Sequence, residues 1–185
     1  DSVFYQPMGL RTMTYNPLTK FGKSEIVPTE DNADFRKSLI HGYVHDPAAA
    51  MLGGVSGHAG LFSNSADVAA ILQMLMNGGF YNGKRFLAPE TINRFTKYQY
   101  INSRRGIGFD KPEPNSRKVN PVSDYASGKT FGHSGFTGTQ MWADPENGIV
   151  YVFLSNRVFP NADNKKLISM SVRTKIMDVI YESME

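Results

Sequence analysis

The chain contains no cysteine among its 185 residues. There is therefore neither a disulfide framework nor a thiol nucleophile, and most patterns of metal-binding sites are excluded. No apolar run approaches the roughly 20 residues that a membrane-spanning helix needs. The opening stretch DSVFYQPMGL also lacks the charged segment that begins a signal peptide. The sequence accordingly predicts no transmembrane segment, while the absence of cysteine leaves the cellular compartment open.

A strong bias of charge is also missing, because the formal net charge is only +3. The basic residues are scattered, apart from the pairs Arg104-Arg105 and Lys165-Lys166. Without a basic stripe, no nucleic-acid partner is expected. The hydrophobic content of 41% and aromatic content of 12% are typical of a globular protein. A chain of this length can form one domain with its own core.

The first third of the chain is dominated by turn-forming residues. Residues 1–50 are expected to form loops with short extended pieces, since proline and glycine recur without apolar periodicity. Four glycines then occur close together, interleaved with apolar residues, at Gly53, Gly54, Gly57 and Gly60. This pattern indicates a loop that turns sharply and is held against a core. Because the chain starts within aromatic, structured-looking sequence, we expect it to be part of a longer polypeptide.

The remaining sequence shows helical and strand patterns in turn. Ser65 is the expected cap of the first helix, Asn77-Gly78-Gly79 its end, and Pro89 the start of the second helix. A polar loop is expected over residues 111–121. Helices are predicted over 65–76, 89–98 and 167–180, and strands over 106–110, 139–144 and 149–155. This order predicts an α+β fold with an antiparallel sheet flanked by helices.

The stretch GKTFGHSGFTGTQMWADP raises the question of whether Ser134 is a nucleophile. A nucleophile elbow has the pattern Gly-x-Ser-x-Gly and turns from a strand into a helix. The segments around Ser134 and Ser56 both lack the last glycine, and a strand follows Ser134. Adjacent side chains on a strand also point to opposite faces, which separates His133 from Ser134. Ser134 is therefore not expected to be the nucleophile.

The other histidines lie in the loop-rich part of the chain. His41 and His45 have the spacing His-x-x-x-His, but the nearby Gly42 and Pro47 disfavour a helix, and no glutamate follows His41. We interpret both as histidines that tie loops together, with a metal site as the minor alternative. His58 lies within the glycine loop and is a candidate for lining a site.

Two long segments resemble a known family. They are MLGGVSGHAGLFSNSADVAAILQMLMNGGFYNGKRFLAPETI and FGHSGFTGTQMWADPENGIVYVFLSNRVFPN. Both are similar to the serine β-lactamase and penicillin-binding-protein superfamily, in particular to the branch of class C β-lactamases, esterases and D-amino-acid peptidases. That family uses three motifs: Ser-x-x-Lys with the nucleophile and its base, Tyr-x-Asn with a proton-shuttling phenol, and Lys-Thr-Gly or His-x-Gly on a strand beside the cleft.

Only the third motif has a counterpart here, His133-Ser134-Gly135. No serine is followed by lysine three positions on, and Tyr100-Ile101-Asn102 and Tyr125-Ala126-Ser127 lie downstream of where the family places its tyrosine. The resemblance thus implies that residues 1–185 are the C-terminal portion of one partial β-lactamase/transpeptidase-like domain. Its partner would be an N-terminal half with Ser-x-x-Lys and Tyr-x-Asn.

The resemblance also implies roles for individual residues. The backbone N–H of Phe136 would be one of two oxyanion donors, Gly135 would leave room for the acyl group, and His133 would replace the lysine of true β-lactamases. Because histidine is mostly neutral at pH 7, this replacement favours esterase or peptidase chemistry over β-lactam hydrolysis. Substrate contacts are expected from Ser134, Thr137, His58 and Asn161, although Thr137 also suits an ordinary strand and Asn161 an ordinary turn.

The resemblance therefore predicts a serine hydrolase that acts on esters or amides through an acyl-enzyme, without metal or cofactor, and a chain that is inactive alone. The alternative is a non-catalytic module that binds cell-wall peptide or saccharide. Relatives of this kind favour a periplasmic or extracellular location. Without the N-terminal half, apolar surface on the sheet is expected to be exposed and to promote self-association. The sequence does not define the substrate.

Overall fold

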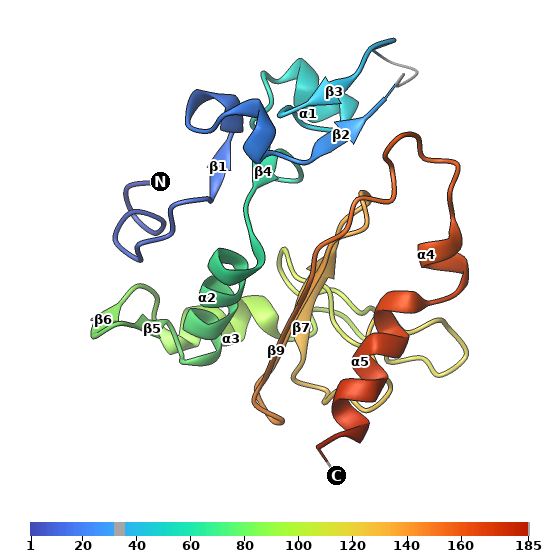
Figure 1. Ribbon diagram of the computed structural model, residues 1–185. Coiled ribbons are helices and arrows are strands. Elements are labelled where there is room, and N and C mark those ends of the chain that lie inside the picture. The colour runs from blue at the N-terminus through green and yellow to red at the C-terminus, as the bar shows by residue number, and fades with distance from the viewer. Residues whose placement is uncertain (32–35, 185) are drawn as a thin grey trace.

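The computed structural model describes residues 1–31 and 36–184, and it has the predicted α+β architecture. Three consecutive strands form an antiparallel sheet in the order β7 (Phe131–Ser134), β8 (Gln140–Asp144) and β9 (Ile149–Phe153). Figure 1 shows helices α2 (Ser65–Met76) and α5 (Val172–Glu182) on opposite sides of this sheet. The strands predicted at 139–144 and 149–155 are thereby confirmed, as is the connecting turn at 145–148.

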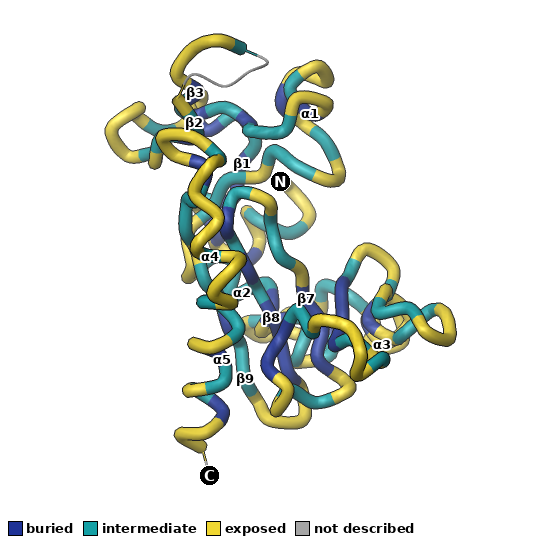
Figure 2. The backbone as a smooth tube through the Cα atoms, turned by 90° about the vertical axis from the view of Figure 1, so that its right-hand side faces the viewer, coloured by how far each residue is buried: buried dark blue, intermediate teal, exposed yellow. Residues whose placement is uncertain are grey.

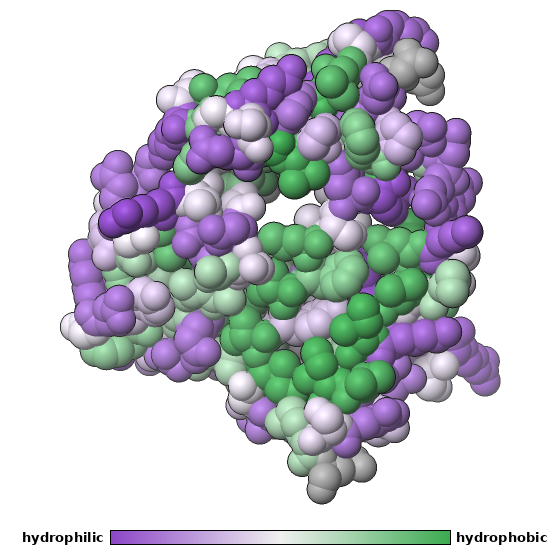
Figure 3. Space-filling model, in the orientation of Figure 1, coloured by the Kyte–Doolittle hydropathy of each residue, from purple (hydrophilic) through white to green (hydrophobic). Residues whose placement is uncertain are grey.

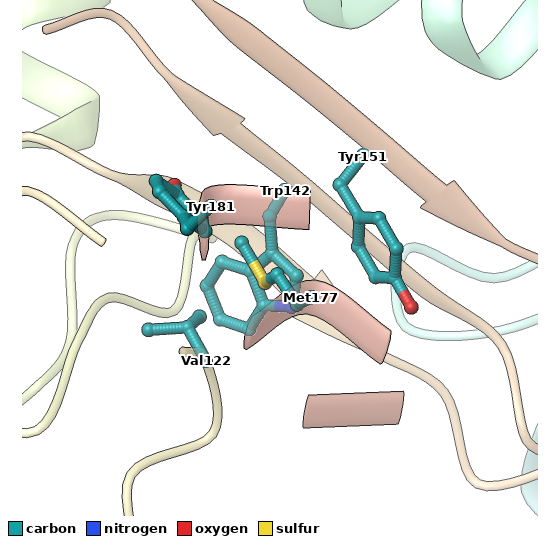
Figure 4. Close-up of a cluster of buried hydrophobic side chains, with 5 residues drawn as sticks. All are labelled: Val122, Trp142, Tyr151, Met177 and Tyr181. Carbon is teal, nitrogen blue, oxygen red and sulfur yellow. The ribbon is translucent and has the colours of Figure 1, made fainter. Parts of the chain in front are cut away.

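The two faces of β8 bury different parts of the core, because successive side chains of a strand point in opposite directions. Trp142 is fully buried and packs against Met177 and Tyr181 of α5, together with Val122 and Tyr151 (Figure 4). Its neighbour Ala143 packs on the other face with Leu72 of α2. Truncating a buried tryptophan costs about 3–5 kcal/mol, so the Trp142 cluster is a major part of what holds α5 to the sheet.

The first two predicted helices are present. Helix α2 has the predicted bounds, but its cap is Asn64, whose side chain accepts the Asp67 amide at 2.9 Å, and not Ser65 as expected. The helix ends where Gly78 and Gly79 adopt positive φ angles of 63° and 87°. Helix α3 (Pro89–Thr96) starts at the predicted proline. Between these helices lies a small hairpin of β5 (Phe80–Tyr81) and β6 (Lys84–Arg85).

The turn-rich first third forms a separate group of short elements, here called the upper lobe (residues 14–31 and 36–62; Figure 1). Its strands pair antiparallel, β1 with β4 and β2 with β3. The elements are β1 (Thr14–Tyr15), β2 (Pro28–Glu30), β3 (Ile40–His41), β4 (Leu61–Phe62), α1 (Pro47–Met51) and two 3-10 turns, Pro17–Thr19 and Lys23–Glu25. Figure 2 shows that exposed and intermediate residues predominate in this lobe, whereas buried residues concentrate in the sheet.

Two predictions about the chain are wrong in detail. Residues 106–110 form a turn, because Gly106 donates to the Phe109 carbonyl and Gly108 has a φ of 73°; only Asp110 pairs with Gly132 of β7. The C-terminal segment consists of two helices, α4 (Lys166–Ser169) and α5, because Ser171 between them is left-handed. Within α5, Met177 and Tyr181 are buried, whereas Val179 is 63% exposed.

The outer edge of β9 has no strand neighbour among the described residues, since the sheet ends there. Apolar side chains gather around β9 between α2 and α5, and the surface is hollowed between this area and the upper lobe (Figure 3). Exposed apolar side chains from residue 154 onwards include Leu154, Ile168, Met170, Ile176 and Val179. Unpaired edges and large apolar patches are typical of interfaces.

Candidate functional site

The third-motif strand β7 ends at an exposed histidine followed by a half-buried serine. Nδ1 of His133 lies 2.8 Å from the carbonyl oxygen of Ser134, and since that oxygen can only accept, Nδ1 carries the proton. In the neutral ring Nε2 is then an acceptor, and a guanidinium nitrogen of Arg105 lies 3.4 Å from it. The ring of His133 is thus bonded to a carbonyl and an arginine, not to the Ser134 hydroxyl, which agrees with the rejection of Ser134 as a nucleophile.

Arg105 reaches His133 because of the turn over residues 106–109. That turn places the fully buried carboxylate of Asp110 within 3.1 Å of Arg104 Nε and 3.3 Å of an Arg105 nitrogen. Asp110 itself exchanges two backbone hydrogen bonds with Gly132, at 2.8 and 3.0 Å, so the pair of arginines is fixed to β7. The sequence pattern showed Arg104-Arg105 only as a basic pair, and nothing in it indicated that Arg105 lies beside the third motif.

The connection from β7 to β8 is a tight turn in which the N–H groups of Phe136 and Thr137 have no acceptor among the described residues. Gly135 donates to the carbonyl of Thr139 at 2.8 Å, and Gly138 donates to the carbonyl of Gly135 at 3.1 Å. A side chain at Gly135 would overlap the Thr139 hydroxyl, which gives a structural reason for glycine there. Among the described residues, no acceptor is bonded to the N–H of Phe136. This N–H at the end of the strand can donate to a ligand.

The side chain of Phe136 is 64% exposed but is contacted by residues from two distant segments. The imidazole of His45 stacks on it with 5.2 Å between ring centroids and 29° between planes. The guanidinium of Arg157 lies over the ring at 4.4 Å from its centroid. His45 is also paired with Glu30 at 3.1 Å. His45 therefore ties the upper lobe to the site, in line with the interpretation of a loop-tying histidine, while sequence reasoning missed its contact with Phe136.

His58 belongs to a separate hydrogen-bonded chain in the upper lobe. Its Nε2 lies 3.0 Å from a carboxylate oxygen of Asp46, and its Nδ1 lies 2.8 Å from the hydroxyl of Ser56. The same Asp46 oxygen caps α1 by accepting the Ala49 amide, and this bond, followed by the bond from His58, lowers the pKa of Asp46. His58 thus bonds within the glycine loop and to α1, and the structure does not bring it into contact with His133.

The remaining predicted substrate contacts are Thr137, in the turn after β7, and Asn161, which follows β9. Thr137 is half-buried, and its carbonyl accepts the Arg157 amide at 2.9 Å. Asn161 is exposed, and its side chain accepts the Asp163 amide at 3.1 Å, as in the turn interpretation. A hollow of about 250 Å³ borders Arg157 and is lined also by Ser155, Asn156, Asn164, Lys166, Leu167 and Val172. Ser155 of this hollow donates to the carbonyl of Gly138 in the turn at 2.9 Å.

The strand next to the site is anchored by Asp144, which is fully buried at the end of β8. Burial alone would raise the pKa of this carboxyl, but hydrogen bonds from the Ser127 hydroxyl and amide, from Asn147 and from Tyr181 outweigh it and hold the pKa well below its usual value. Burial and the bond to Asp144 in turn raise the pKa of Tyr181. The loop before β7, the β8–β9 turn and α5 therefore meet at one carboxylate.

Two further properties concern only the part of the chain that the structure describes. Within it, no group of three or more histidine, aspartate and glutamate side chains is arranged to hold a metal ion. No helix in the same residues is both long enough and apolar enough to cross a bilayer.

An antiparallel sheet with helices on both faces is the architecture of the β-lactamase fold, of which this chain contains a part. A crystal structure of a β-lactamase from Mycobacterium bovis aligns with 98% of this chain and 54% of that chain, at a TM-score of 0.60 and 17% identity. A penicillin-binding protein homologue from Caulobacter crescentus aligns with 83% of this chain and 44% of its own, at a TM-score of 0.51 and 19% identity. These likenesses show the fold.

The chain belongs to the Beta-lactamase family, whose model matches residues 6–169. A protein from Escherichia coli strain K12 named "Putative D-alanyl-D-alanine carboxypeptidase" is 38% identical over 179 residues, which cover 90% of this chain and 41% of that protein. A protein of the same name from Salmonella enteritidis PT4 is 34% identical over 206 aligned residues, covering 100% of this chain and 48% of that protein. The chain thus spans less than half the length of these relatives.

Proposed function

We propose that this chain is the C-terminal portion of a serine hydrolase domain that transfers acyl groups from esters or amides through an acyl-enzyme. The observation that carries this proposal is the N–H of Phe136, which has no acceptor among the described residues and follows Gly135 in a turn fixed by two backbone hydrogen bonds. An oxyanion donor must be held in place and must be free before the reaction. Removing such a donor typically raises the barrier by about 3–4 kcal/mol. The chain contributes this wall of the cleft, and neither metal nor cofactor takes part.

The substrate class follows from the charge beside the motif. His133 is no permanent cation, but the Arg105 guanidinium 3.4 Å from its Nε2 is always charged. Arg104 and Arg105 share the single carboxylate of Asp110, so the cluster keeps one net positive charge and takes the place of the lysine in other members of the family. This charge suits an amide or ester that carries a carboxylate, such as a peptide ending in D-alanine, in agreement with the names of the relatives. A β-lactam has the same arrangement and is a second substrate to test.

The nucleophile would come from a region upstream of residue 1 that carries Ser-x-x-Lys and Tyr-x-Asn. The free edge of β9 and the apolar side chains around it offer that region a strand partner and a surface to cover. In isolation the chain has no partner there, so it is inactive and self-associates through the same surface. Residues 1–185 and the upstream region then form one domain.

Active-site labelling with a fluorophosphonate tests this proposal. The probe is applied to the chain alone and to the chain joined to its upstream region, and the modified residue is mapped. Labelling only of the joined protein, on a serine outside these 185 residues, is the expected result. Labelling of Ser134 or Ser56 in the chain alone contradicts it, and no labelling in either preparation favours a module that binds cell-wall peptide or saccharide.

The role of Phe136 is tested by removing its N–H. Proline at this position has no backbone donor, so Phe136→Pro should lower kcat of the joined protein by about 100-fold to 1,000-fold. Phe136→Ala is the matched control, because it removes the same ring but keeps the N–H. Equal activity of the two variants would show that the N–H is not the donor.

A further inference from the structure

Arg157 makes three contacts with the turn that presents the Phe136 N–H. Its backbone amide donates to the Thr137 carbonyl at 2.9 Å, its Nε donates to the Phe136 carbonyl at 2.8 Å, and its guanidinium covers the Phe136 ring at 4.4 Å. The contacts span two successive peptide groups and the side chain of one residue. Phe136 therefore has little freedom to rotate, although its ring is 64% exposed.

The opposite end of the turn is held by a second arginine. Arg173 of α5 donates to the Thr139 carbonyl at 2.9 Å, while the imidazole of His45 stacks on the Phe136 ring. Arg173 and His45 thus connect the turn to α5 and to the upper lobe. The Gly138 amide bonds the carbonyl of the peptide group that contains the Phe136 N–H, and Arg157 bonds the next two carbonyls. Among the described side chains, Arg157 is the one that bonds the Phe136 carbonyl, so its loss is the side-chain change expected to alter the direction of that N–H most directly.

We propose that Arg157 is a positioning residue for the oxyanion donor of this site, an inference that rests on the proposed function. An N–H stabilises a developing oxyanion only when it is already aimed at the place where the charge forms. The Nε bond to the Phe136 carbonyl and the cover on its ring fix the orientation of this segment before substrate binds. Arg157 acts through Phe136 and does not touch the reacting atoms.

A role of Arg157 in binding a substrate carboxylate is the competing interpretation, and kinetics separate the two. A group that binds ground state and transition state alike changes KM and leaves kcat, whereas a group that positions a transition-state donor changes kcat. We therefore expect Arg157→Gln to lower kcat of the joined protein at least tenfold, with KM changed less than twofold. Arg157→Lys should recover little activity, because an ammonium group cannot both bond the carbonyl and cover the ring.

The matched control is Lys166→Gln, which removes a positive charge from the same 250 Å³ hollow without changing a contact to the turn. It should leave kcat unchanged. Melting temperatures of all variants show whether folding is intact. A normal kcat in folded Arg157→Gln overturns the inference, and so does a rise of KM alone, which would make Arg157 a substrate-binding residue.

A second measurement does not depend on activity. The backbone order parameter of the Phe136 amide, from 15N relaxation, should fall in Arg157→Gln from about 0.85, typical of rigid backbone, towards 0.6. It should not change in Lys166→Gln. If the wild-type joined protein proves inactive, the proposed function fails, and the order parameter still decides whether Arg157 holds this amide. An unchanged value overturns the positioning role.

Discussion

Replacing Asp144 by asparagine tests how much this buried carboxylate contributes to the stability of the sheet. Three bonds reach Oδ1 of this buried carboxylate, from the Ser127 hydroxyl at 2.6 Å and from the amides of Glu146 at 3.1 Å and Asn147 at 3.4 Å. Three reach Oδ2, from the Ser127 amide at 2.9 Å, the Asn147 side chain at 2.8 Å and the Tyr181 hydroxyl at 2.7 Å. Every partner donates to the carboxylate, so no uncharged side chain of the same shape can accept all six hydrogen bonds.

In Asp144→Asn, one oxygen becomes an NH₂ group that faces two N–H donors and one hydroxyl whichever way the amide turns, and only the hydroxyl can rotate to accept from it. Hydrogen bonds to a charged group contribute about 1.5–3 kcal/mol each, and removing one partner of a buried charged cluster costs about 3–5 kcal/mol. We expect the free energy of unfolding to fall by about 4 kcal/mol. Tyr181→Phe, which removes a single donor, should cost about 1.5 kcal/mol.

Urea unfolding followed by tryptophan fluorescence measures both variants. Trp142, the only tryptophan of the chain, is fully buried beside Tyr181 and reports on this region. The pKa of Asp144 is lowered on folding, so its stabilisation is fully present above the ordinary value of about 3.8 and is lost as the pH falls below it. Asp144→Asn should lack this loss. The reasoning would be refuted if Asp144→Asn lowered the free energy of unfolding by less than about 1 kcal/mol, or if the variant lost stability at low pH as the original protein does.

Three further predictions concern other buried or exposed positions. Burial lowers the pKa of Lys111 from 10.5 to about 8. Between these two pH values the unfolded state binds more protons than the folded state, so the free energy of unfolding should rise with pH by up to about 3 kcal/mol. In urea unfolding experiments at several pH values, Lys111→Met should not show this rise. A side chain at Gly132 would overlap the Met141 carbonyl across the sheet, so Gly132→Ala should lower stability by about 3 kcal/mol in the same assay, and an unaltered midpoint would contradict this. Val179 is 63% exposed, so Val179→Glu should reduce self-association in sedimentation and binding of a hydrophobic dye without lowering the melting temperature; unchanged association would mean that another surface is responsible.

Local patterns were sufficient for much of the fold. The hairpin of β8 and β9 could be predicted because residues 149–153 are all β-branched or aromatic and Pro145-Glu146-Asn147-Gly148 is a strong turn signal. Helix α2 was equally clear, since its apolar spacing and terminal glycines agree. The segment 106–110 failed because Gly108 adopts a left-handed conformation, and a short apolar run does not reveal on its own whether it continues as a strand.

For the site, too, features within one short segment could be predicted, whereas contacts between distant segments could not. The strand that carries His133-Ser134-Gly135, now β7, was expected from the family motif, and the exclusion of Ser134 followed from strand geometry. The contacts of Arg105, His45 and Arg157 with this motif join residues far apart in the chain, at distances that no spacing rule encodes. The C-terminal segment was predicted as one helix because its apolar spacing does not reveal the left-handed Ser171 that divides it into α4 and α5.

The meander of β7, β8 and β9 has a consequence for the order in which the chain folds. Its strands are neighbours in sequence as well as in the sheet, so their pairing closes only short loops, whereas Thr14 of β1 must find Phe62 of β4. Because the entropy lost in closing a loop grows with its length, structures of low contact order form faster. We expect the meander to form early and to act as the template on which α2 and α5 dock. The upper lobe, which contacts the site through His45, would be among the last parts of the chain to fold.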